Sequence, residues 1–265
     1  MKFNKKYTQY WASTLEKSID GTTIAGPNEA KYFLDLISLK ESSSILDLGC
    51  SFGRMFDLLN SYSENIYGVD PDEYAVKEAN KKSYIDVLKG SAEKTGFEEN
   101  FFNLVFCWAT FDVVDHFKGL KEFNRILKNK GTLLITGKST NYNKDDLLAF
   151  KAEKNAFLKN FPNRFTDLEI FINNLNEFGF SLKHLYLFPR RGDFGKLNLE
   201  LHDNLINSSN LSYEYLIICE KKSLVSENLE RLDKPDHILS QTSIKLAKEK
   251  GFKTAQEMFK TIGLD

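Results

Sequence analysis

Short apolar segments alternate with segments of helical periodicity from Ser44 onward, and this alternation restricts the possible folds most strongly. The apolar segments are Ser44–Leu48, Asn65–Val69, Ser83–Leu88, Leu104–Trp108 and Gly131–Thr136. The clearest helical segments between them are Gly53–Ser61, Pro71–Lys82 and Lys118–Leu127. Continuous apolar strands separated by helices are typical of a parallel sheet covered on both faces. The carboxyl ends of such strands lie along one edge, where these folds bind ligands.

The order of elements changes after Thr136. Two helices are predicted over 145–161 and 166–178, followed by strands over Ser181–Phe188 and Tyr213–Glu220. From Lys221 the pattern is helical: Pro235 suits a first helical turn, and Thr254–Glu257 has capping-box spacing. The sequence therefore predicts a helical appendage over 221–265, acting as a packing arm or as the contact of a homodimer.

Composition excludes several classes of function. The 36 basic and 37 acidic residues leave a net charge of -1, without the basic surface that nucleic-acid binding needs. No apolar run approaches the roughly 18–20 residues of a membrane span, and the first ten residues are polar. The three cysteines, Cys50, Cys107 and Cys219, are widely spaced. We therefore expect no disulfide framework, no metal site, and localisation in a reducing cytoplasm.

The loop Asp47–Gly53 is the most informative stretch. A strand that ends in Asp and turns through glycines into a helix exposes backbone N–H groups and lets a ligand approach the main chain. A nicotinamide fingerprint GxGxxG would need glycine at positions 51 and 54, which are Ser51 and Arg54. A phosphate-binding P-loop is also excluded, because the residues before Gly137-Lys138-Ser139 form a strand. The loop therefore suits a nucleoside without a diphosphate.

Two further loops are expected at the same edge of the sheet. Asp70 ends the second strand, where an acidic side chain can accept both hydroxyl protons of a ribose; it could alternatively cap the helix that opens at Pro71. Gly90-Ser91-Ala92-Glu93 follows the third strand, where a base edge would lie. Loops spaced for a ribose, an adenine and a charged tail fit S-adenosylmethionine, whose cationic sulfonium is compatible with the Asp47 carboxylate.

The span Ser44–Lys138 resembles the class I S-adenosylmethionine-dependent methyltransferases, especially the small-molecule group that includes quinone-biosynthesis enzymes. The matching motifs are Asp47–Gly53, Tyr67–Pro71, Gly90–Glu93, Phe102–Val105 and Glu122–Ile135. Ser51 stands where the family often has a second glycine, and Ser91 replaces a common Asp that contacts the adenine amino group.

The resemblance implies a doubly wound, mostly parallel seven-stranded α/β sheet whose last strand, Tyr213–Glu220, runs antiparallel. It implies a methyltransferase domain over 1–220, with a cofactor-binding core at 44–138 and a helical insert at 141–180 on the acceptor side. The cofactor would be S-adenosylmethionine, with S-adenosylhomocysteine as product. The residues implied to bind it are Asp47, Gly49, Cys50, Ser51, Gly53, Asp70, Pro71, Ser91, Ala92, Glu93 and Trp108.

Histidines and arginines are the candidates on the acceptor side. His116 matches a position where the family often carries a histidine, and Asp112 or Asp115 could orient it as a general base; His202 is a second candidate base. Arg190 and Arg191, beside a glycine turn, could hold a phosphate or carboxylate, and Arg164 could join them. Tyr10 and Trp11, with Tyr7, could fold over the cofactor or form an apolar latch.

The sequence thus predicts a methyltransferase of a small molecule, acting on oxygen or nitrogen. The two arginines favour an anionic acceptor such as a phosphorylated or nucleotide-linked sugar. One alternative is an apolar aromatic or quinone acceptor, which would need an apolar pocket without arginines. Another is a methyltransferase-like scaffold that binds the cofactor, or a partner, without catalysing a reaction.

Overall fold

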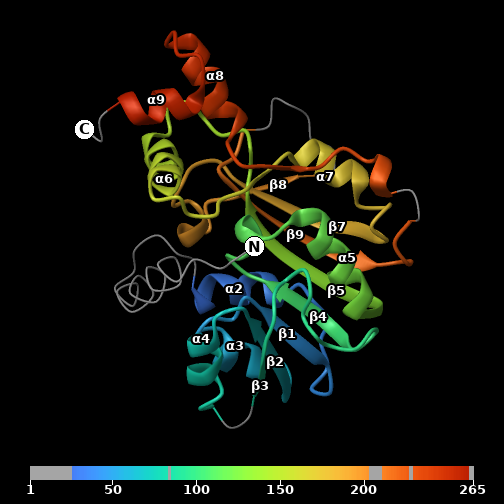
Figure 1. The fold of residues 1–265 in the computed structure, drawn as a ribbon. Coiled ribbons are helices and arrows are strands. Elements are labelled where there is room, and N and C mark those ends of the chain that lie inside the picture. Colours follow the sequence, from blue (N-terminus) through green and yellow to red (C-terminus); the bar gives the residue numbers. More distant parts are fainter. Residues whose placement is uncertain (1–25, 83–84, 203–210, 227–228, 263–265) are drawn as a thin grey trace.

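A mixed sheet forms the centre of the molecule in the computed structural model, which describes residues 26–82, 85–202, 211–226 and 229–262 (Figure 1). The described residues contribute eight strands to it, in the order β3-β2-β1-β4-β5-β9-β7-β8. The parallel strands β1 to β5 are Ser44–Leu48, Asn65–Asp70, Asp86–Lys89, Phe102–Cys107 and Leu127–Lys138. The strand order reverses between β1 and β4, and ligands of open α/β sheets bind at such a point.

The far half of the sheet is antiparallel. Strand β9 (Glu214–Lys221) runs antiparallel between β5 and β7 (Phe180–Phe188), which confirms the predicted direction of the last strand. One detail of the prediction is wrong: Glu200–His202 forms an additional edge strand, β8, so the sheet has eight strands among the described residues rather than seven. His202 therefore lies in a strand paired with Leu185, not in a loop.

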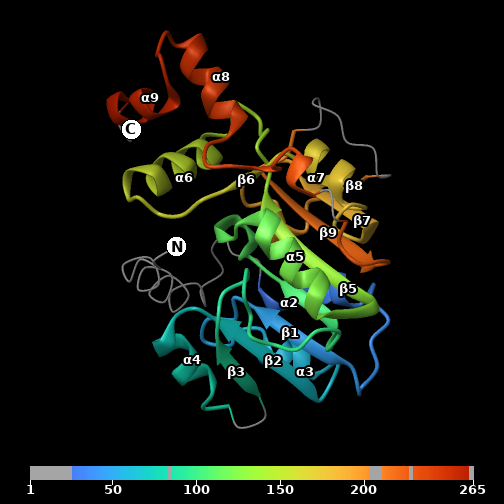
Figure 2. The same ribbon diagram turned by 45° about the vertical axis from the view of Figure 1, so that its right-hand side comes forward.

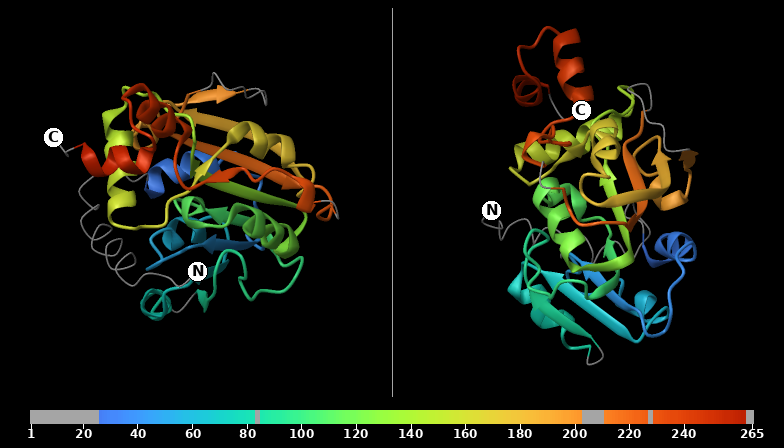
Figure 3. Two further views of the ribbon diagram at one scale, coloured as in Figure 1. Left: turned by 45° about the horizontal axis from the view of Figure 1, so that its top comes forward. Right: turned by 90° about the vertical axis from the view of Figure 1, so that its right-hand side faces the viewer.

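Helices cover both faces of the sheet, as the continuous apolar strands predict. One face packs against α2 (Pro27–Leu34), α3 (Phe56–Asn60) and α4 (Glu73–Ala79). The other packs against α5 (His116–Ile126) and α7 (Leu168–Asn174). The right-hand view of Figure 3 shows the sheet between α2 in blue and α5 in green. A doubly wound α/β fold is thus confirmed.

Short elements connect these helices and strands. The 3-10 turns are η2 (Phe111–Val113), η3 (Phe194–Lys196) and η4 (Leu229–Arg231). Strands β6 (Phe165–Thr166) and β10 (Asp236–His237) pair antiparallel and join the insert to the chain after β9. Pro235 therefore does not open a helix: it precedes β10, and its carbonyl oxygen accepts the N–H of Asp167.

The C-terminal helices α8 (Gln241–Glu249) and α9 (Ala255–Thr261) lie beside α6 (Leu147–Leu158), at the top of Figure 1 and Figure 2. Thr254 caps α9 by accepting the N–H of Glu257, as the capping-box spacing predicts. The ring of Phe259 contacts both Phe150 and Phe157 of α6. The apolar face of the appendage is therefore used within the chain, which removes the main argument for a homodimer contact there.

A buried carboxylate fastens the appendage to α6. Glu153 is 1% exposed and accepts hydrogen bonds from the hydroxyls of Tyr142 (2.7 Å), Ser240 (2.7 Å) and Ser243 (2.6 Å). It also accepts the backbone N–H of Ser240, the N-cap residue of α8, at 2.8 Å. A buried carboxylate with this many donors keeps its charge solvated, and the start of α8 is held in place by it.

No helix among the described residues is both long and apolar enough to cross a membrane. In the same residues no three His, Cys, Asp or Glu side chains gather where they could hold a metal ion.

Replacing Glu153 by alanine should loosen α8 and α9, because the variant leaves buried hydroxyl and amide donors unsatisfied. The expected loss is about 1–3 kcal/mol of local stability. Amide hydrogen exchange should therefore quicken in α8 and α9 but not in β1 or β4. Glu249→Ala, which removes only an exposed contact to Lys144, is the control; equal exchange rates in the two variants would contradict the assigned role of Glu153.

Candidate functional site

The turn after β1 has a backbone shape that its residues dictate. Gly49 has a φ of +76°, and a Cβ atom built on it would overlap the side chain of Thr110, which follows β4. Only glycine fits at such a position. Ser51 also has a positive φ, 48°, in the left-handed region that favours glycine. This conformation explains why a glycine is common at the position that Ser51 occupies in this chain.

Asp70, at the end of β2, closes this turn. Its carboxylate accepts the N–H of Ser51 at 3.0 Å and the N–H of Asp72 at 2.9 Å, and the residue is 8% exposed. Burial raises the pKa of Asp70 to about 6, against these two hydrogen bonds, which lower it. A carboxylate has about four lone-pair positions, so two remain for ligand hydroxyls. Asp70 does not cap α4, since Asp72 accepts the N–H of Ala75 in that role.

Asp47 has an oxygen without a partner at the edge where the sheet reverses direction. The residue is 3% exposed, and its Oδ2 atom makes no hydrogen bond with any described residue. Burial raises the pKa of Asp47 to about 7; the positive charge of Arg54 opposes this shift and the charge of Asp70 adds to it. A buried carboxylate without full compensation favours a cationic ligand beside it.

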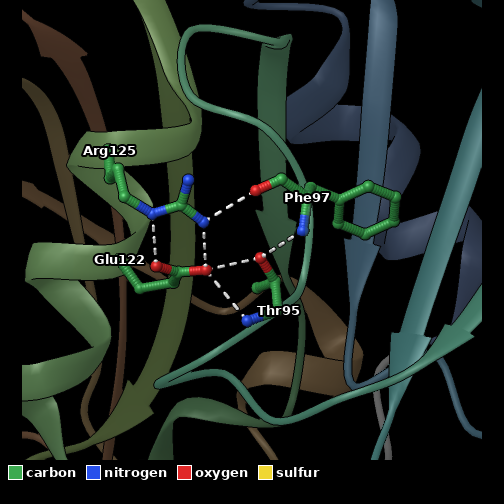
Figure 4. A network of polar contacts seen from close by, with 4 residues as sticks. All are labelled: Thr95, Phe97, Glu122 and Arg125. Atoms are coloured by element: carbon green, nitrogen blue, oxygen red, sulfur yellow. Dashed lines mark hydrogen bonds and ion pairs between the residues drawn. The ribbon is translucent and has the colours of Figure 1, made fainter.

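The loop after β3 is braced from α5 (Figure 4). Glu122 accepts both the N–H and the hydroxyl of Thr95, at 2.9 and 2.6 Å, and is paired with Arg125 at 2.7 Å. Arg125 in turn donates to the carbonyl oxygen of Phe97 at 2.8 Å. Although burial acts to raise the pKa of Glu122, the bonds from Arg125 and Thr95 hold it below its ordinary value.

The predicted adenine-side residues stand directly before this brace. Ser91 and Lys94 exchange backbone hydrogen bonds of 3.1 and 3.0 Å. The Glu93 carboxylate accepts the N–H of Asp115 at 2.8 Å, which ties the loop to the start of α5. The loop is therefore held from two sides. Glu122 belongs to the sequence motif Glu122–Ile135, but the sequence does not show that Thr95 is its partner. Its structural role could therefore not be predicted.

Two predicted site residues are core side chains instead. His116 is fully buried, its ring stacks on Phe111 with centroids 3.9 Å apart, and its Nε2 bonds the Phe111 carbonyl at 3.1 Å. Burial lowers its pKa to about 3. Neither Asp112 nor Asp115 bonds the ring, and this buried position argues against the predicted role of His116 as a general base.

Trp108 is 4% exposed and stacks on Phe106, with Phe194 on its other neighbouring side. Its indole packs in the part of the core that contains Phe33 of α2, which gives no support to the predicted cofactor contact. Cys50 is also buried, and burial raises its pKa well above the ordinary value, so it stays a thiol. Tyr7, Tyr10 and Trp11 lie outside the described residues.

The three predicted arginines do not form one group. Arg164 pairs with Asp236 of β10, and the exposed Arg190 pairs with Asp145 at 3.0 Å. Arg191 is partly buried and donates to the hydroxyl of Tyr213 at 2.8 Å. Arg164 joins the polar groups at the carboxyl edge of β5 only through its backbone N–H, which donates to the carbonyl oxygen of Asp112. Of the three arginine side chains, we find only that of Arg191 bonded there among the described residues.

Those polar groups form a cluster that the sequence analysis did not identify. Lys138, the last residue of β5, bonds the Asp112 carboxylate and, at 2.9 Å, the side-chain oxygen of Asn163. Glu214 lies opposite Lys138 in the adjacent strand β9. We call Asp112, Lys138, Asn163, Arg191, Tyr213 and Glu214 the edge cluster. It could not be predicted because β5 and β9 are far apart in the chain.

Replacing Glu122 by glutamine should weaken the loop brace, because an amide carries no charge and one of its two polar ends cannot accept. We expect a loss of about 1–3 kcal/mol in the free energy of unfolding, measured by urea denaturation. Glu98→Gln, in the same loop but exposed, should change it by less than about 0.5 kcal/mol. Similar losses in both variants would show that the brace contributes nothing specific.

The raised pKa of Asp47 predicts a pH-dependent stability. Because its pKa in the folded protein, about 7, exceeds the ordinary value of 3.8, the stability it contributes is present below pH 4 and lost as pH rises through 7. Urea unfolding of the parent and of Asp47→Asn between pH 4 and 8 should show the parent losing stability relative to the variant. If the difference in free energy of unfolding between the parent and Asp47→Asn stays constant over this pH range, the raised pKa of Asp47 is contradicted.

Known proteins share part of the sequence of this chain and its fold. Residues 46–135 match the family model of the methyltransferase domain. An uncharacterized protein of Methanocaldococcus jannaschii is 29% identical over 123 residues, which are 45% of this chain and 50% of that protein. The sterol 24-C-methyltransferase of Kluyveromyces lactis is 29% identical over 106 residues, 37% of this chain and 29% of that protein. The chain thus spans half or less of the length of these relatives.

Solved structures agree on the fold. A SAM-dependent methyltransferase from Thermotoga maritima superposes with a TM-score of 0.55 at 23% identity, covering 73% of this chain and 87% of that one. The methyltransferase in a complex with the Trm112 activator of Haloferax volcanii superposes with a TM-score of 0.59 at 14% identity. The superposition covers 83% of this chain and 100% of that one. Residues 46–135 therefore match the methyltransferase domain, and the chain shares the fold of these solved methyltransferases.

Proposed function

We propose that this protein transfers the methyl group of S-adenosylmethionine to an oxygen or nitrogen atom of a small molecule. The observation that carries the proposal is a carboxylate oxygen of Asp47 that has no hydrogen-bond partner among the described residues and is buried beside the Gly49 turn and Asp70. S-adenosylmethionine supplies a reactive methyl group on a positively charged sulfur. The Asp47 carboxylate suits that charge, the free lone pairs of Asp70 suit a ribose, and the braced loop 90–97 suits an adenine.

Orientation is the main contribution that we propose for this chain. The Gly49–Thr110 contact and the Ser51–Asp70 bond hold the cofactor-side loops rigidly at the reversal of the sheet. Holding two reactants in line in this way can lower a barrier by ~7–11 kcal/mol. Asp47 and Asp70 stay in place because both belong to strands, β1 and β2, rather than to loops.

The edge cluster supports a polar acceptor. It lies at the carboxyl ends of β4 and β5, beside the proposed cofactor site, and α6 follows β5 in the chain. Its lysine, arginine and carboxylates would be costly to bury against an apolar ring system. We therefore favour a polar acceptor over the quinone alternative. The similarity to a sterol methyltransferase covers 37% of this chain and does not identify its acceptor.

We further propose that the division of the chain follows the sequence pattern, with the methyltransferase domain at 1–220 and the appendage at 221–265. The net charge of -1 supports small molecules rather than nucleic acids as partners. The three cysteines are free and buried, which is compatible with the predicted cytoplasmic localisation.

Arg191 now carries the prediction of an anionic acceptor. If the acceptor has a phosphate or carboxylate, Arg191→Ala should raise its KM at least about tenfold, because a charge-assisted bond contributes ~1.5–3 kcal/mol. Arg190→Ala is the matched control, since Arg190 is exposed and paired with Asp145. An unchanged KM in Arg191→Ala would exclude an anionic group at this position and leave a neutral or cationic acceptor.

Calorimetric titration with S-adenosylmethionine and S-adenosylhomocysteine tests the proposed function directly. We expect the parent to bind both nucleosides and Asp70→Ala to lose at least tenfold in affinity for each. The control is Glu73→Ala, which follows the same strand but is exposed and paired with Lys89; it should bind like the parent. Binding without turnover of any acceptor would support the non-catalytic scaffold, and absence of binding would contradict the proposal.

A further inference from the structure

Glu214 occupies a defined place at the carboxyl edge of the sheet. It is the first residue of β9, opposite Lys138 at the end of β5 and Phe188 at the end of β7. Side chains alternate along a strand, so Glu214 shares the face of Leu216, which packs with the α2 and α3 side of the core. The side chain is partly exposed there. A ligand at the edge of β5 can therefore reach it.

The other charged groups of the edge cluster are already engaged. Lys138 is turned toward Asp112 and Asn163, and Arg191 toward Tyr213. Asp146, which caps α6, accepts the N–H groups of Ala149 and Arg191 at 3.0 and 2.8 Å. Glu214, in contrast, makes no side-chain hydrogen bond or ion pair with any described residue. It is the carboxylate of the cluster that remains available to a ligand.

Four charged side chains act on Glu214: Arg191, Lys138, Asp112 and Asp146. Burial raises its pKa to about 7, opposed by Arg191 and Lys138 and assisted by Asp112 and Asp146. When Glu214 is ionised, the group contains two cations, Arg191 and Lys138, and three carboxylates, Glu214, Asp112 and Asp146. The negative charges outnumber the positive ones, and this excess favours the binding of a proton by Glu214. A group that titrates near neutral pH is suited to accept a proton and release it again.

We propose that Glu214 is a catalytic residue that takes the proton from the nucleophilic atom of the acceptor. The proposal rests on the proposed function. In the step, a lone pair of the acceptor oxygen or nitrogen forms a bond to the methyl carbon. The bond between that carbon and sulfur breaks, and its electron pair stays on sulfur as a neutral thioether. The acceptor proton passes to the Glu214 carboxylate, which later returns it to water.

This assignment fills the position that His116 leaves open. His116 is sealed in the core against Phe111, so no acceptor can contact it. Lys138 is held as a cation, since Asp112 and Tyr213 raise its pKa although burial lowers it. Lys138 therefore acts as a neighbour that stabilises the ionised form of Glu214 rather than as the proton acceptor.

A titration by NMR tests the proposal without knowledge of the acceptor. Protein with 13C-labelled glutamate carboxyl groups is titrated between pH 5 and 9, and the Glu214 signal is assigned by its absence in Glu214→Gln. A carboxylate that takes the acceptor proton must lie near the sulfonium. Saturating S-adenosylmethionine should therefore lower its midpoint by about one pH unit, as expected for an opposite charge within ~4–6 Å.

The matched ligand is S-adenosylhomocysteine, which has no positive sulfur and should not produce this shift. The matched carboxyl group is Glu220, at the other end of β9, which pairs with Lys183 and Lys222 and should respond to neither nucleoside. Equal midpoints of Glu214 with both nucleosides, when calorimetry shows both bound, would overturn this proposal and leave the proposed function intact. Absence of binding in the calorimetry would overturn both.

Kinetics with an acceptor from a screen of hydroxyl and amine compounds gives a second, independent measure. Glu214→Gln should lower kcat by about 10²–10⁴-fold, the usual contribution of a positioned general base. The affinity of Glu214→Gln for S-adenosylmethionine should stay within twofold of that of the parent. In the plot of kcat against pH, the rise that the parent shows near pH 7 should be absent from the variant. A variant that keeps both its kcat and that rise would overturn the proposal.

Discussion

The turn between β1 and α3 is the constraint on which the site depends. Gly49 allows the backbone to pass against Thr110, so the ends of β1 and β4 are in direct contact. Asp70 then binds the N–H of Ser51, which joins the ends of β1 and β2. Three strand ends are thereby locked together at the point where the sheet reverses direction, and the other site residues are arranged around them.

Carboxyl groups with raised pKa values are the second common feature of this edge. Burial raises the pKa of Asp47, Asp70 and Glu214 above the ordinary values. Each is expensive to ionise without a partner, and each lies where a strand meets the ligand-binding edge. A fold selected for stability alone would pair or replace such groups, so their retention is consistent with a cationic ligand and with proton transfer.

The remaining charged groups are used to hold the structure. Glu122 braces the loop before β4, and Glu153 secures α8 against α6. Both are buried and fully bonded, unlike Asp47 and Glu214. This contrast sets Asp47 and Glu214, for which we propose functional roles, apart from Glu122 and Glu153, which hold the structure.

The sequence by itself determined the α/β fold, the order of β1 to β5, and the loops at Asp47, Asp70 and Gly90, because strand ends and glycine turns are local signals. It could not show that His116 is sealed in the core or that Arg164 and Arg190 are paired, because burial and partners depend on distant segments. The edge cluster was decided only by the tertiary structure. Glu214 meets Lys138 through an antiparallel pairing between strands separated by the insert, and no local pattern encodes that register.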